Sequence, residues 1–149
     1  MATLEESKRL LQAEYDRIRS DWYAGHRNIA PAVLDVRLGD GSAGYSHSSN
    51  TLLIFISEEN LPEIDRHLRG EKHWFGKLRW FIHQTELIHE MLHEYQFKIL
   101  VEPSPEGRAL FAKYQNRFFG PNHNDLFFTA IADKAAYFHV SPDELVNEL

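Results

Sequence analysis

The sequence predicts an α+β fold in which a small antiparallel sheet of about three strands packs against helices. Segments with apolar residues at the helical period lie towards both ends of the chain, and Val- and Leu-rich segments separated by turn residues lie between them. A length of 149 residues suits one domain with a sizeable core. We therefore expect residues 1–149 to form a single domain.

The first expected element is a helix over residues 3–24. Thr3 and Glu6 have the spacing of a capping box, and Gly25 is a typical helix stop. We interpret this segment as a packing helix rather than a membrane or partner helix, because its apolar residues form one stripe. The stripe consists of Leu4, Leu11, Tyr15, Ile18 and Trp22.

Three strands are expected within residues 32–57. Residues 32–38 alternate weakly, and the Gly-Asp-Gly-Ser run that follows them indicates a turn. Residues 43–48 and 51–57 are the second and third candidates. Because the last of these, TLLIFIS, is continuously apolar, we expect it to be covered on both faces.

A short helix is expected from Ser57 to about Arg69, and a basic, aromatic stretch follows over residues 66–81. Interleaved cations and aromatic rings can bind single-stranded nucleic acid through phosphate contacts and base stacking. The chain carries a net charge of −6, however, which gives no general attraction to nucleic acid or to anionic membranes. A solvated rim is therefore the favoured interpretation of this stretch.

Helices are expected to fill the remainder of the chain, over residues 78–97 and 105–149. Each of the later helices begins at a residue type that is common at helix N-termini. These expected caps are Ser104, one of Asn122 and Asn124, and Ser141.

The chain contains no cysteine, which excludes disulfides and any thiolate zinc ribbon. The first residues lack the basic and apolar regions of a signal peptide, and no apolar run approaches the length of a membrane span. The sequence therefore predicts a cytoplasmic protein without a membrane partner.

One motif carries most of the chemistry, because His89, Glu90 and His93 form H-E-x-x-H. Residues four apart lie on one face of a helix, so the two imidazoles can bind one metal ion. Glu90 lies about 100° round the helix from His89, within reach of a water on that metal. The flanking residues are mainly apolar, which indicates a buried helix and favours a metal site over core histidines satisfied by hydrogen bonds.

A catalytic zinc site usually has three protein ligands and one open position for water. His123 is the preferred third ligand, because it opens a helix whose apolar face would pack on the core and direct the imidazole to the metal. Asp125 or Glu106, and then His139, are the alternatives. For His47, on the middle expected strand, a solvent-facing or hydrogen-bonded position is favoured over metal binding.

These segments resemble the SprT-like zinc metallopeptidases. Members of that family have H-E-x-x-H and a later H-G-x-x-F/W segment, and this chain has HEMLHEYQ at residues 89–96 and HNDLF at residues 123–127. A strand hairpin and a short helix also precede the motif, as in the family. The resemblance covers residues 30–138 and implies a zincin-like domain with the motif on a central helix.

Carried over residue by residue, the resemblance implies that His89, His93 and His123 bind Zn²⁺ and that Glu90 is the general base. The chain departs from the family in three respects. Asn124 replaces the usual glycine, the interval between His93 and His123 contains an extra helical segment, and the cysteine zinc ribbon of many members is absent.

The sequence thus predicts a zinc-dependent metalloendopeptidase acting on a protein or peptide. Zn²⁺ would lower the pKa of a water, and Glu90 would take its proton and return it to the leaving amine. The edge of the predicted sheet would hold the peptide by strand addition. Candidate residues that orient the histidines are Glu86 and Asp125, and candidate oxyanion donors are Tyr95, Tyr137 and His139.

Two other functions are compatible with the same residues. One is a non-catalytic, zinc-stabilised module that binds a protein or single-stranded DNA through residues 66–81. The other is a metal-dependent hydrolase of a non-peptide bond. Imidazole ligands favour zinc over other divalent ions in each case.

Overall fold

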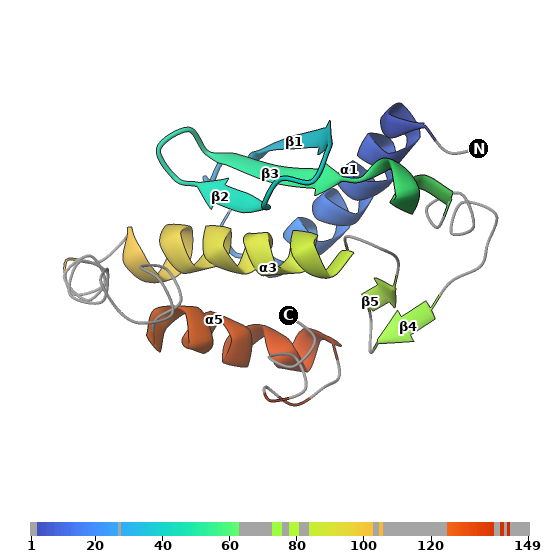
Figure 1. The fold of residues 1–149 in the computed structure, drawn as a ribbon. Coiled ribbons are helices and arrows are strands. Elements are labelled where there is room, and N and C mark those ends of the chain that lie inside the picture. The colour runs from blue at the N-terminus through green and yellow to red at the C-terminus, as the bar shows by residue number, and fades with distance from the viewer. Residues whose placement is uncertain are drawn as a thin grey trace.

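A computed structural model describes residues 3–26, 28–62, 73–75, 78–80, 84–102 and 125–138, together with residues 105, 141 and 143. The fold of these residues is mixed α+β, with three α-helices and a three-stranded mixed sheet. Figure 1 shows the sheet on one side of helix α3 and helix α5 on the other. The expected division into one domain over the whole chain stays a prediction.

Helix α1 (Leu4–Trp22) has the predicted capping box at its start. The Thr3 hydroxyl accepts from the Glu6 amide, and the Glu6 carboxylate accepts from the Thr3 amide, both at 3.2 Å. The predicted apolar stripe is confirmed as the face that packs on β1 and α3, although Leu4 is only half-buried. Its buried members are Leu11, Tyr15, Ile18 and Trp22.

The sheet contains the three predicted strands, β1 (Val33–Leu38), β2 (Gly44–Ser46) and β3 (Thr51–Ile56). Its order is β1-β3-β2, with β2 antiparallel and β1 parallel to β3, so the prediction of a purely antiparallel sheet is wrong. Strands β1 and β2 run in opposite directions, but β3 is inserted between them. Gly39, at a φ of +141°, begins the connection that crosses the end of β3, and its amide donates to the Ile56 carbonyl at 2.9 Å.

Strand β3 has one fully buried face and one half-buried face. Leu52, Ile54 and Ile56 are fully buried, whereas the alternate residues retain partial exposure. Within the described part of the chain, the expectation of full cover on both faces is therefore not met. The loop after β1 supplies some of the cover, because a Cβ at Gly41 would lie 2.5 Å from the Phe55 ring, which would have to shift to make room for it.

The region after the sheet differs most from the prediction. Ser57 precedes a 3₁₀ turn, η1 (Glu58–Asn60), but its side chain makes no capping hydrogen bond. An antiparallel hairpin of β4 (His73–Phe75) and β5 (Leu78–Trp80) was not predicted. Because β5 occupies residues 78–80, the motif helix begins at Gln84 rather than at residue 78. Residues 63–72, including most of the expected short helix, lie outside the described residues.

The motif helix α3 (Gln84–Tyr95) continues as a π-helical segment, η2 (Gln96–Val101), beyond its predicted end. Helix α5 (Asp125–Ala135) packs on both and ends in a 3₁₀ turn, η3 (Ala136–Phe138), as expected for a helix ending near residue 138. The helices expected from Ser104 and Ser141 lie almost entirely outside the described residues. In the part that is described, no helix is both long and apolar enough to cross a membrane.

Candidate metal centre

The structure brings His89, Glu90 and His93 together on α3. One ligand atom from each residue lies within 4.8 Å of the other two, which is a spacing that could hold a metal ion. The His89 Nε2 and Glu90 Oε1 atoms are 3.8 Å apart, and the centroids of the two imidazole rings are 5.0 Å apart. The H-E-x-x-H motif therefore forms the cluster that its helical spacing predicts.

Burial of the neighbouring apolar residues fixes the orientation of the cluster. Leu87, Ile88, Met91 and Leu92 are fully buried against the sheet and the other helices. Glu90 and His93 are 6% and 8% exposed, whereas the side chain of His89 is 24% exposed. The cluster thus lies at the edge of the core, with the His89 side nearest to solvent.

His93 has a partner that the sequence analysis missed. Its Nδ1 atom lies 3.0 Å from Oε1 of Gln96, which is buried. An amide oxygen only accepts hydrogen bonds, so this contact is a hydrogen bond when Nδ1 carries the proton, and that form leaves Nε2 as the atom suited to bind a metal. The available signal was the i, i+3 spacing of His93 and Gln96 on one helix.

The donor set fits a zinc ion. Neutral imidazoles with one ring nitrogen held by a hydrogen bond are typical zinc ligands, and a carboxylate beside them serves as a base or a further ligand. Of the two carboxylates predicted to orient the histidines, Glu86 is exposed and Asp125 is described only as the first residue of α5. The structure therefore shows a possible metal-binding group, and it leaves the identity of the metal open.

Burial raises the pKa of Glu90 from 4.5 to about 7, and the nearby charge of Glu86 adds to this effect. Among the described residues, the only ion-pair contact of Glu90 is with His89. A carboxylate with a pKa near neutrality can both accept and release a proton at neutral pH. These are the properties required of a general base.

A second buried carboxylate, Glu94, lies one turn further along the motif helix and is fully buried. It accepts hydrogen bonds from the Tyr15 hydroxyl at 2.9 and 3.1 Å and from Lys98 Nζ at 2.5 Å. The same hydroxyl accepts from the Ala32 amide at 2.8 Å, and Lys98 donates to the Ala30 carbonyl at 2.8 Å. These bonds tie α3 to α1 and to the segment before β1.

The predicted third ligand, His123, lies outside the described residues, as do Glu106 and His139. Helix α5 begins at Asp125, two positions after His123, and packs against α3 (Figure 1). This arrangement agrees with the expected placement of α5 beside the motif helix. The assignment of the third ligand itself stays a prediction.

Two predicted oxyanion donors have other contacts in the structure. The Tyr137 hydroxyl donates to Asp21 Oδ2 at 2.8 Å and accepts from Arg17 at 3.3 Å, so its proton is engaged with α1. Tyr95 is buried, and Lys134 Nζ lies 4.1 Å from the centre of its ring. These contacts favour a structural role for Tyr137 and leave the role of Tyr95 untested.

His47 lies in the turn between β2 and β3 rather than on the expected strand, and it is not a member of the cluster of His89, Glu90 and His93. It is exposed and stacks on Phe97, with 4.3 Å between ring centroids and 12° between ring planes. The expected solvent-facing position is therefore confirmed. The basic, aromatic stretch over residues 66–81 is described only by the backbones of β4 and β5, so its proposed contact with nucleic acid stays untested.

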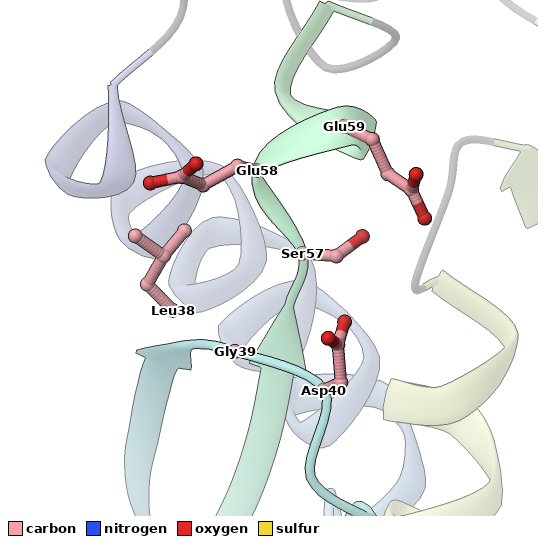
Figure 2. A pocket seen from close by; sticks show the side chains of 6 residues that line it. All are labelled: Leu38, Gly39, Asp40, Ser57, Glu58 and Glu59. Atoms are coloured by element: carbon pink, nitrogen blue, oxygen red, sulfur yellow. The ribbon is translucent and has the colours of Figure 1, made fainter.

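An open hollow lies at the end of the sheet, where the connections after β1 and β3 meet. Figure 2 shows the Asp40 and Glu59 carboxylates and the Ser57 hydroxyl on one side of it, with Glu58 turned towards Leu38. The three acidic residues are exposed, and none of the described residues that line the hollow belongs to α3. We assign it no part in the metal centre.

Comparisons with protein-family models, with curated proteins and with solved structures find no match to this chain. The resemblance to SprT-like metallopeptidases therefore depends on the motif residues and their order along the chain.

Proposed function

We propose that the protein is a zinc-dependent peptidase of the SprT-like, zincin-like type. The observation that carries this proposal is the convergence of His89, Glu90 and His93 within 4.8 Å on a buried helix. His89 and His93 are two ligands in this proposal, and His123 is the third.

The chain's own residues perform the proton transfers in this mechanism. A bound Zn²⁺ supplies a Lewis acid that lowers the pKa of a water and polarises the peptide carbonyl. Glu90, whose carboxylate lies beside His89, takes the proton of the attacking water and delivers it to the leaving amine. His93 is held for metal binding by Gln96.

The edge of strand β2 supports a peptide as the substrate. Among the described strands, β2 pairs only with β3, and it packs against α3. An extended peptide added to its other edge would gain main-chain hydrogen bonds that do not depend on side-chain identity. Such a peptide would run beside the helix that carries Glu90.

Substitution of Glu90 by Gln tests the mechanism. The variant should bind the same amount of zinc and cleave a peptide library roughly 10²- to 10⁴-fold more slowly, because it lacks the general base. Glu5→Gln, an exposed change on α1, is the matched control and should behave like the wild type. Undiminished cleavage by Glu90→Gln would overturn the mechanism.

The same assay separates the alternatives. Ester and non-peptide amide substrates should be run beside the peptide library. Stoichiometric zinc without cleavage of any substrate would instead indicate a non-catalytic metal-stabilised module. A salt-dependent affinity for single-stranded DNA would support that outcome.

Metal analysis of His123→Ala tests the third ligand. The variant should lose most of its zinc at a chelator concentration that the wild type withstands, as His93→Ala should. Unchanged zinc content in His123→Ala alone would remove His123 from the site and make Asp125 or Glu106 the next candidate for the third ligand.

A further inference from the structure

Gln96 occupies a position that couples the motif helix to the π-helical segment after it. It is the first residue of η2, and only 1% of its surface is exposed. Its Oε1 atom lies 3.0 Å from His93 Nδ1. Because both side chains are buried, loss of the amide acceptor would remove a hydrogen bond that bulk water does not readily replace.

The hydrogen bond selects one of the two neutral forms of the His93 ring. With the proton on Nδ1, the lone pair lies on Nε2, which is the ring atom remote from the backbone. With the proton on Nε2, the Nδ1 lone pair would face the lone pairs of the Gln96 oxygen. The buried contact therefore favours the Nδ1–H form.

Contacts of the following residues hold η2 in place without a metal. Phe97 stacks on His47, and Lys98 binds both Glu94 and the Ala30 carbonyl. The Glu102 amide donates to the Phe97 carbonyl at 2.8 Å, which is the i to i+5 bond of a π-helix. Gln96 thus lies at the start of a segment that is anchored to the β2–β3 turn and to the chain before β1.

We infer that Gln96 is a positioning residue that sets the Nδ1–H form of His93 before any metal binds, so that Nε2 is the ligating atom. This inference rests on the proposed metal site. It adds to that site a residue outside the H-E-x-x-H motif and explains why a buried, polar side chain follows the motif by one turn. Residues that orient a metal ligand commonly change metal affinity by roughly 10- to 100-fold when they are replaced.

The first measurement is the tautomer of His93 in the metal-free protein. Long-range proton–nitrogen NMR at a pH above the ordinary imidazole pKa should show the proton on Nδ1 in the wild type and in Gln96→Glu, which keeps an acceptor oxygen. Gln96→Leu should shift the population towards Nε2–H. A wild-type ring protonated on Nε2 would overturn the inference, and this measurement needs no variant to fold.

The second measurement is zinc affinity, obtained by titration against a competing chelator. Gln96→Leu should bind zinc roughly 10- to 100-fold more weakly, and Gln96→Glu should recover most of the loss. Gln12→Leu is the control, because Gln12 is an exposed glutamine on α1 that bonds only to Asp16 among the described contacts. Thermal unfolding of each variant checks that it is folded.

The outcomes of the two measurements are distinguishable. If Gln96→Leu matches the wild type in both tautomer and zinc affinity, the positioning role is wrong while the metal site stands. If the wild type binds no zinc, the proposed function fails, and the tautomer still decides whether Gln96 controls the His93 ring.

Discussion

Glu90 and Glu94 are the same residue type, one turn apart on the same helix, and both are buried, yet their surroundings differ. Glu94 accepts hydrogen bonds from Tyr15 and from the ammonium group of Lys98. Glu90 has only His89 as an ion-pair contact among the described residues, at 3.8 Å, and its pKa is raised to about 7. Burial alone therefore does not determine what a carboxylate does in this helix.

The difference separates a carboxylate held by hydrogen bonds from the one that we propose transfers protons. A buried charge is tolerated when opposite charges and hydrogen-bond donors surround it, and Glu94 has both. A buried carboxylate with few such partners destabilises the fold in its charged form and takes up a proton more readily. On α3 the first arrangement supports the helix, and the second provides the proton acceptor of the proposed mechanism.

The largest loss in the free energy of unfolding is expected when Glu94, the carboxylate held by hydrogen bonds, is replaced. Glu94→Ala leaves Lys98 and the Tyr15 hydroxyl without their shared acceptor, and loss of one partner of a buried pair costs about 3–5 kcal/mol. Urea unfolding of the metal-free protein should show this loss. Glu5→Ala, which removes an exposed pair with Lys8, is the control, and an equally small change in both variants would contradict the prediction.

Glu90→Gln should instead raise the free energy of unfolding of the metal-free protein at neutral pH. Below the ordinary pKa of 4.5, Glu90 is neutral in both folded and unfolded chains, so variant and wild type should differ little in the free energy of unfolding. As the pH rises from 4.5 towards 7, the unfolded chain releases its proton first, and the wild type loses stability that the variant keeps. At neutral pH the variant should be more stable by about 3 kcal/mol.

Urea unfolding at a series of pH values, with a chelator present, measures this difference. Glu94→Gln provides the contrast, because it removes a carboxylate that has partners and should destabilise the protein at neutral pH. If Glu90→Gln gains no stability relative to the wild type between acidic and neutral pH, the pKa of Glu90 is not raised in the folded protein.

Tyr15→Phe should have a smaller effect than Glu94→Ala. It removes the hydroxyl that donates to Glu94 and accepts from the Ala32 amide, at an expected cost of about 1–3 kcal/mol. A double-mutant cycle with Glu94→Ala is the measurement, and the combined loss should be clearly less than the sum of the two single losses. Additive losses would mean that the two residues do not share one network.

The smallest effect is expected from Glu86→Gln, and it concerns the pKa of Glu90. Burial is the main cause of the raised pKa of Glu90, and the charge of Glu86, an exposed residue, is the lesser cause. Removal of that charge should therefore lower the pKa of Glu90 by less than about one unit. Carboxyl carbon NMR of the metal-free protein measures the shift, and a return to 4.5 would contradict the dominance of burial.

Local spacing was enough to predict several parts of this protein. The capping box of Thr3 and Glu6, the three strands of the sheet and the convergence of His89 with His93 each depend on residues a few positions apart. In these cases backbone geometry alone relates sequence separation to distance in space. The H-E-x-x-H cluster could therefore be predicted from the sequence.

Tertiary structure decided the features that depend on distant segments. The insertion of β3 between β1 and β2 made the sheet mixed, because a strand's neighbours are chosen by packing and not by order along the chain. Because strand β5 of the β4–β5 hairpin occupies residues 78–80, the motif helix begins at Gln84 rather than at the predicted residue 78. Neither outcome follows from hydrophobic periodicity.

Glu90 and Glu94 show the same division between what local spacing determined and what the tertiary structure decided. The sequence by itself determined that Glu90 and Glu94 lie one turn apart beside the histidines. Only the fold brought Tyr15, 79 residues away in sequence, to Glu94, whereas none of the described residues is a comparable donor to Glu90. The physical reason is that burial and hydrogen-bond partners, which set the pKa of a carboxylate, come from whichever elements pack around the helix.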